Sequence, residues 1–203
     1  MRFVLASNNA HKLEEFRAIL SGSGVTVLSQ REAGIAVDPE ENGTTFEENS
    51  LIKARAACAA SGLPAIADDS GLTVPALNGE PGIYSARYGG PGLTDEGRYR
   101  YLLERMRDVE DRRAFFVSCI SCVFPDGDEL TVRGECAGRI LTAPEGSGGF
   151  GYDPVFLSDD LGKALGTATP EEKNGISHRG RALRAMCARL EEYFAEKDGR
   201  SAE

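Results

Sequence analysis

The sequence Pro64-Ala65-Ile66-Ala67-Asp68-Asp69-Ser70-Gly71-Leu72 places two adjacent carboxylates directly after a short apolar run. An apolar run of this length predicts a buried strand, and Asp-Asp-Ser-Gly predicts its exit. In α/β proteins, ligands bind at the carboxyl ends of strands. Two carboxylates at such a point hold a hard cation or remove a proton from water. The same four residues are also typical of a plain turn, so this stretch alone leaves both interpretations open.

A second acidic segment, Glu40-Glu41-Asn42-Gly43-Thr44, lies just before a predicted helix. Thr45 and Glu48 fit a capping box, which predicts a helix from near Phe46 to about Ala60. Because this helix leads into the strand with Asp69, we expect the two acidic groups to meet at one sheet edge. The alternative is ordinary surface acids favoured by the helix macrodipole. It stays open for Glu41 and is preferred for two acids of the helix itself, Glu47 and Glu48.

The N-terminus predicts a strand over residues 1–6, a small polar loop at Ser7–Lys12, and then a helix. This arrangement presents backbone N–H groups to a phosphate. Lys12 falls in the first helical turn, where the dipole disfavours a cation unless an anion lies nearby. The loop lacks the glycines of a Walker motif. We therefore interpret it as a phosphate-binding loop of another kind.

Two further segments carry candidate binding residues. Gly148–Pro154 allows close backbone approach to a ligand, and its aromatic rings offer flat faces for a base. The alternative for this segment is a glycine-rich turn with two core aromatics. In Lys173–Gly180, Ser177 is a predicted N-cap, so His178 and Arg179 occupy a first turn that disfavours cations without an acceptor. A single histidine is usually structural, and its coincidence with Lys173 and Arg179 favours a binding role.

Composition limits the classes of function. With 23 basic and 32 acidic residues among 203, the net charge is −9, which argues against a nucleic-acid surface or an anionic membrane partner. No apolar run approaches the roughly 18 residues of a membrane span, and no secretion signal is visible, so we expect a cytoplasmic protein. Cys119 and Cys122 form a CxxC inside a predicted strand, where they point to opposite faces. All five cysteines are therefore interpreted as small core or surface residues.

The middle of the chain predicts antiparallel pairing. Pro125–Asp128 is a turn, and Glu129–Glu135 alternates as a returning strand does. Combined with the strand–helix pattern of the N-terminal part, this predicts an α/β fold with a mixed sheet. We expect one domain over residues 1–195, as a single body or two joined lobes, and a frayed tail over 196–203.

Six motifs in order resemble the inosine triphosphate pyrophosphatases, also called XTP/dITP diphosphatases. The resemblance runs from about Phe3 to Phe194, and Ser50 stands where alanine is expected. The motifs are Ser7-x-Asn9-x-x-Lys12, Glu41-x-Gly43-x-Thr45-Phe46-x-Glu48-Asn49, Ala67-Asp68-Asp69-Ser70-Gly71-Leu72, Pro81-Gly82-Ile83-Tyr84-Ser85-Ala86-Arg87, Gly149-Phe150-Gly151-Tyr152-Asp153-Pro154 and Ser177-His178-Arg179.

The resemblance implies an elongated, twisted sheet with helices at both ends, two lobes enclosing a nucleotide cleft, and a homodimer. It implies hydrolysis of ITP, dITP and XTP to monophosphate and pyrophosphate, which cleanses the nucleotide pool. Mg²⁺ would be held by Glu41 and Asp69, and Asp69 would be the catalytic base, weakened by the neighbouring cation. Whether Asp68 or Glu40 also ligates stays open. The implied substrate-binding residues are Ser7, Asn8, Asn9, Ala10, His11, Lys12, Ser70, Phe150, Gly151, Tyr152, Asp153, Lys173, His178 and Arg179, to which phosphate binding adds Lys53.

Selectivity is expected to rest on position 6 of the purine. Donors from Lys173, His178, Arg179 or the backbone of Phe150–Asp153 would satisfy O6 and face the adenine amino group with like polarity. Two alternatives remain. One is a Maf-like nucleotide diphosphatase acting on modified pyrimidines. The other is a non-catalytic nucleotide-binding protein in which Asp68-Asp69 is only a turn.

Overall fold

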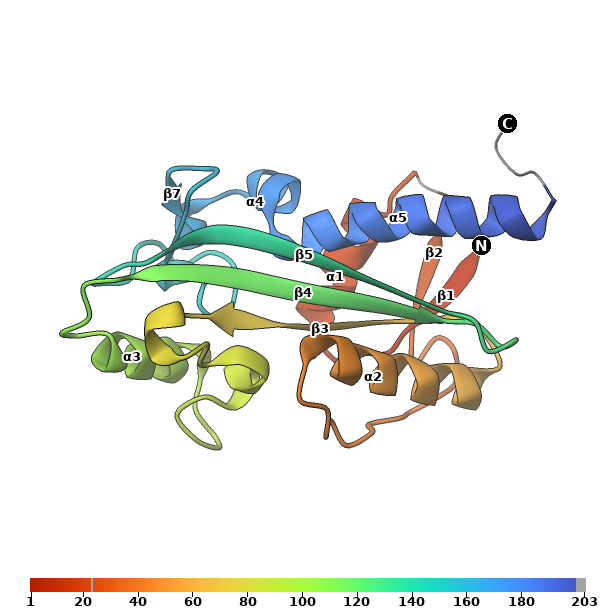
Figure 1. The fold of residues 1–203 in the computed structure, drawn as a ribbon, viewed down its shortest axis with the longest axis horizontal. Coiled ribbons are helices and arrows are strands. Elements are labelled where there is room, and N and C mark those ends of the chain that lie inside the picture. Colours follow the sequence, from red (N-terminus) through yellow and green to blue (C-terminus); the bar gives the residue numbers. More distant parts are fainter. Residues whose placement is uncertain (23, 200–203) are drawn as a thin grey trace. The chain divides into compact units, whose positions relative to one another are not determined.

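The computed structural model describes residues 1–22 and 24–199 and has an α/β fold with a mixed sheet (Figure 1). The strand order is β2-β1-β3-β4-β5-β6-β7. β1 pairs in parallel with β2 and β3, whereas β6 pairs antiparallel with β5 and β7. The predicted mixed α/β sheet is confirmed. The elements are β1 (Arg2–Leu5), α1 (Ala10–Ile19), β2 (Thr26–Ser29), α2 (Phe46–Ser61), β3 (Ala65–Thr73), α3 (Asp95–Arg105), β4 (Arg113–Val123), β5 (Glu129–Ile140), β6 (Phe156–Ser158), β7 (Lys163–Ala164), α4 (Pro170–Ile176) and α5 (His178–Lys197).

The chain divides into two compact units, each with its own core. Unit 1 comprises Met1–Asp69, Cys119–Gly134 and Arg181–Glu203, and unit 2 comprises Ser70–Ser118 and Glu135–Gly180. One division falls inside β3, at the peptide bond between Asp69 and Ser70. The nucleotide cleft implied by the family resemblance stays a prediction.

In unit 1, helices cover both faces of the strands, with α5 on one side and α2 on the other (Figure 1). Successive side chains of a strand point to opposite faces. Phe3 and Leu5 of β1 therefore join a cluster with residues of α1 and α5, whereas Val4 joins a cluster with the alanines of α2. Burial on both faces explains why residues 3–5 of β1 are all apolar.

The core of unit 2 is formed by buried apolar side chains from strands and from helix α3. Its fully buried members include Leu72 of β3, Leu102 of α3, Ile140 of β5 and Phe156 of β6.

A tight turn after Phe124 joins β4 to β5 and lies in unit 1. The Phe124 amide closes this turn by donating to the Asp128 carbonyl at 2.9 Å. The predicted hairpin connection is confirmed.

Helix boundaries follow their capping residues. Thr45 caps α2 by accepting a hydrogen bond from the Glu48 amide at 3.1 Å, and Gly62 ends the helix in the left-handed conformation with φ 66°. The Glu48 carboxylate accepts from the Thr44 amide at 2.6 Å. α5 extends to Lys197, so the first two residues of the expected tail are helical, and residues 200–203 lie outside the described part.

The five cysteines all lie in the described part of the chain, and none of them forms a disulfide. Cys122 belongs to the core of unit 1, and Cys119 contacts Glu47 from the other face of β4. Within residues 1–22 and 24–199, no helix combines the length and apolar character required to cross a membrane.

Candidate active site

The two adjacent acids lie inside β3, not at its exit as the sequence predicted. Asp68 is 1% and Asp69 7% exposed, and each carboxylate pairs with a lysine from another element. Because these charges are compensated, the strand continues through them to Thr73. The neighbouring β1 does end here, since its last residue, Leu5, pairs with Ile66. The acids therefore lie just beyond the carboxyl end of β1, and the interpretation of Asp68-Asp69 as a plain turn is wrong.

Lys12 pairs with Asp68. Its ammonium lies 2.8 Å from a carboxylate oxygen of Asp68 and donates to the Asp68 carbonyl at 3.3 Å. Asn9 caps α1, accepting from the Lys12 amide at 3.2 Å, and residues 8–11 are exposed. The Asp68 carboxylate is therefore an anion of the kind that sequence analysis expected near Lys12. The exposed residues of this turn lie at a helix N-terminus, where a phosphate can bind, although the amides of Ser7, Asn9 and Lys12 already donate hydrogen bonds within the chain.

Lys53 of α2 joins the two acidic segments. Its ammonium lies 2.7 Å from Asp69 Oδ1 and 3.3 Å from Glu41 Oε1. Burial acts to lower the pKa of Lys53, but the charges of Asp69 and Glu41 outweigh it and raise that pKa. Burial also raises the pKa of Asp69, and the charges of Lys53 and Lys12 offset this only in part. Without a metal ion, burial therefore outweighs the two ammonium groups at Asp69; the weakening of this base by a bound Mg²⁺ stays a prediction.

Asn49 is a buried polar residue of this group to which the sequence interpretation gave no role. It is fully buried, accepts from the Gly43 amide at 2.9 Å, and its side-chain amide faces Asp69 Oδ2 at 3.5 Å. A Cβ on Gly43 would lie 2.6 Å from the Asn49 oxygen, so glycine permits this close approach. Asn49 and Lys53 are four residues apart and share one face of α2. That spacing of polar residues on an alanine-rich helix was the available signal.

The other acids of this region have different surroundings. Glu40 is exposed, so Glu41 is the member of its pair that reaches the lysine. Glu47 contacts Arg133 at 3.0 Å and the Cys119 thiol at 2.9 Å, and Glu48 caps the start of α2. The preference for ordinary structural roles of Glu47 and Glu48 agrees with these contacts.

The glycine-rich loop of unit 2 is organised by Asp153. This carboxylate, 2% exposed, accepts from the Phe150 amide at 2.9 Å and from the Lys173 ammonium at 2.8 Å. Gly149 has φ +73°, and a Cβ there would lie 2.1 Å from the Asp153 carboxylate. Asp153 therefore holds its own loop, and Tyr152, 4% exposed, packs in the core with its hydroxyl donating to the Ser85 carbonyl at 2.8 Å. The ring of Tyr152 presents no exposed face on which a base could stack.

Phe150 carries the half-buried ring of this loop. The Lys173 ammonium lies 4.5 Å and the Arg179 guanidinium 5.8 Å from its centroid. Arg179 is 1% exposed and donates to the Ser70 hydroxyl at 2.9 Å. His178, 5% exposed, stacks on Phe116 with a centroid distance of 4.8 Å. Both residues begin α5, as the sequence predicted.

Asp95, the first residue of α3, also holds the loop, and sequence analysis did not single it out. Its carboxylate accepts from the Gly151 amide at 2.7 Å and pairs with Arg98. The amides of Phe150 and Gly151 therefore donate to Asp153 and Asp95. Neither is directed to a base edge, contrary to one of the expected sources of selectivity.

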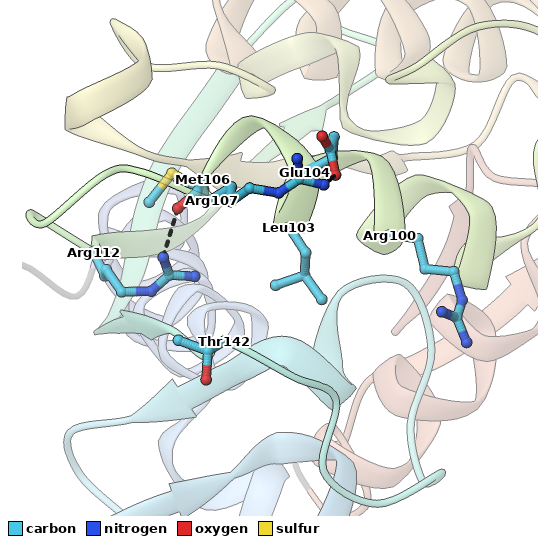
Figure 2. Close-up of a pocket in the computed structure, with 7 residues that line it drawn as sticks. All are labelled: Arg100, Leu103, Glu104, Met106, Arg107, Arg112 and Thr142. Carbon is cyan, nitrogen blue, oxygen red and sulfur yellow. Dashed lines mark hydrogen bonds and ion pairs between the residues drawn. The ribbon is translucent and has the colours of Figure 1, made fainter.

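A separate hollow of about 470 Å³ opens beside α3 in unit 2 (Figure 2). It includes none of the predicted site residues. Arg112 in its wall donates to the carbonyls of Met106, Ile140 and Leu141 at 2.8, 2.6 and 2.6 Å. It thus ties the end of α3 to the end of β5. The lining residues are Arg100, Leu103, Glu104, Met106, Arg107, Arg112 and Thr142.

Comparison with known proteins adds four findings. Residues 3–189 match the model of the Ham1 family. A protein of Symbiobacterium thermophilum named dITP/XTP pyrophosphatase is 50% identical over 202 residues, covering 96% of this chain and 98% of the relative. The structure of the Staphylococcus aureus Ham1 protein superposes with a TM-score of 0.86 at 42% identity, covering 95% of this chain and 100% of that one. A HAM1 protein from Coxiella burnetii gives 0.87 at 41% identity, with 95% and 99% covered.

Proposed function

The chain belongs to the Ham1 family, and we propose that it hydrolyses ITP, dITP and XTP to the monophosphate and pyrophosphate. The name dITP/XTP pyrophosphatase of a relative that is 50% identical supports this substrate class. Such a reaction removes deaminated purine nucleotides from the nucleotide pool.

The observation that carries the proposal is the ion-pair group of unit 1. Asp68 and Asp69 stand side by side in β3, paired with Lys12 and Lys53. A cluster of paired carboxylates and lysines that is largely withdrawn from solvent is typical of a catalytic site. The family match over residues 3–189 argues against the Maf-like alternative.

The donor set around Glu41 and Asp69 fits Mg²⁺. Mg²⁺ is usually bound through one or two carboxylates, with water and substrate phosphates completing its shell. Within the described ranges, no group of three or more His, Cys, Asp or Glu could hold a metal ion. The bound ion would neutralise phosphate charge during the reaction.

Asp69 is proposed as the base that takes the proton of the attacking water. A bound Mg²⁺ would lower the pKa of the attacking water, so that a carboxylate beside it could take the proton. Before nucleotide binds, Lys53 and Asn49 face the two oxygens of Asp69 at 2.7 and 3.5 Å. The Ser7–Lys12 segment at the start of α1, the Lys12 ammonium and Ser70 would bind phosphate oxygens.

The loop of unit 2 is proposed to bind the base. Phe150 offers the stacking surface, and Lys173, His178 and Arg179 supply donors for O6 of hypoxanthine or xanthine. Adenine carries an amino group at that position, so a donor facing it is left unpaired. Asp153 and Asp95 hold the loop in shape through the Phe150 and Gly151 amides.

Pyrophosphate release from ITP, XTP, dITP, ATP and GTP, with and without Mg²⁺, tests the proposal. We expect Mg²⁺-dependent release and a preference of about 10⁴ for ITP over ATP. Comparable kcat/KM values for ITP and ATP would contradict it. We further propose a cytoplasmic homodimer that binds neither nucleic acid nor membrane, in agreement with the net charge of −9.

A further inference from the structure

The carboxylate oxygens proposed to hold the metal already have a cation in contact with them. The Lys53 ammonium lies 2.7 Å from Asp69 Oδ1 and 3.3 Å from Glu41 Oε1. The second oxygen of Asp69 faces the Asn49 amide at 3.5 Å. Both oxygens of Asp69 are therefore directed at hydrogen-bond donors.

Lys53 cannot easily turn into solvent in this arrangement. Its side chain is 13% exposed and that of Asp69 10%, so the pair is largely desolvated. A divalent ion bound to Asp69 and Glu41 would lie within a few ångströms of the ammonium, and like charges at such a distance repel strongly where water is scarce. The ammonium and the metal thus compete for the same two carboxylates.

We propose that Lys53 excludes free divalent cations from the Glu41–Asp69 pair and yields its place when a triphosphate arrives. This inference rests on the proposed function, because it takes the same residues as the metal site. The phosphates, with several negative charges, offer the ammonium another partner and bring the divalent ion with them. Metal and nucleotide therefore bind together, and the metal binds weakly alone.

The test measures Mn²⁺ binding without nucleotide. Mn²⁺ accepts the same oxygen ligands as Mg²⁺, and its free form gives an electron paramagnetic resonance signal that falls on binding. Lys53→Met removes the ammonium, and Lys53→Gln keeps a donor for Asp69, so that one variant folds even if the other does not. The matched control is Lys12→Met, which removes the same charge from the neighbouring Lys12–Asp68 pair.

We expect both Lys53 variants to bind Mn²⁺ at least about tenfold more tightly than the wild type, equivalent to about 1.4 kcal/mol, and the Lys12 variant to gain much less. Equal affinity in the wild type and the Lys53 variants would overturn the inference. An equal gain in Mn²⁺ affinity in Lys12→Met would also overturn the inference. It would show that removing any nearby positive charge favours Mn²⁺, without competition for the same carboxylates. Hydrolysis plays no part in this assay. Failure of pyrophosphate release would refute the proposed function, whereas unchanged Mn²⁺ affinity would refute the role of Lys53.

Discussion

Asp69→Asn tests the site where its geometry is most specific. The substitution keeps the shape of the side chain but removes the basic oxygen and the charge that pairs with Lys53 at 2.7 Å. Loss of a general base lowers turnover by about 10²–10⁴, and loss of a metal ligand adds to this. Steady-state pyrophosphate release at saturating ITP and Mg²⁺ measures the effect. Turnover within about threefold of the wild type would refute the assignment of Asp69, given that expected loss.

The stability of Asp69→Asn must be measured together with its turnover, because the substitution also breaks a buried ion pair. Breaking such a pair by removing one partner costs about 3–5 kcal/mol. Here Glu41 remains 3.3 Å from Lys53, so we expect a smaller loss of about 1–3 kcal/mol in urea unfolding. Asp68→Asn is the matched control, since it breaks the pair with Lys12 one residue away. It should lose at least as much stability and retain more turnover; equal loss of turnover in both variants would contradict the separate role of Asp69.

Three further predictions concern other contacts. Lys12→Ala should weaken binding of ITP, with Lys12→Arg rescuing it only in part because the guanidinium is broader; unchanged KM and kcat would show that this lysine does not hold phosphate. Asp95→Ala should raise KM for ITP by about tenfold, since it removes the charge-assisted hydrogen bond from the Gly151 amide. Asp95→Asn keeps an acceptor and should return KM most of the way to the wild-type value; an unaltered KM in both variants would refute the positioning role of Asp95. Arg112→Met should lower the free energy of unfolding by about 2–4 kcal/mol, because three carbonyls lose a charged donor, while kcat for ITP stays the same; a variant as stable as the wild type would contradict this account of its role.

Local signals in the sequence were sufficient for most of the elements. The capping box at Thr45 and Glu48 predicts a helix from near Phe46 to about Ala60, and α2 runs from Phe46 to Ser61. The end of β3 could not be found in this way. Asp68 and Asp69 were predicted to lie at the exit because Asp-Asp-Ser-Gly is typical of a turn. The lysines that compensate them come from positions 12 and 53, and only the tertiary fold reveals that pairing.

The candidate site shows the same limit. Burial of Tyr152 in the core and the use of the Gly151 amide by Asp95 depend on how unit 2 packs around the loop, which a sequence pattern does not contain. Ser50, which stands where alanine was expected, illustrates a local compensation. Its hydroxyl lies 2.6 Å from that of Ser121 on β4, so the buried polar group has a partner.

The products of ITP hydrolysis test the central claim most directly. Phosphorus nuclear magnetic resonance of ITP incubated with the wild-type protein and Mg²⁺ separates the two possible cleavages. Attack between the α and β phosphates, which we predict, gives inosine monophosphate and pyrophosphate in equal amounts. Release of orthophosphate with inosine diphosphate, or no turnover of ITP at all, would contradict the proposed reaction.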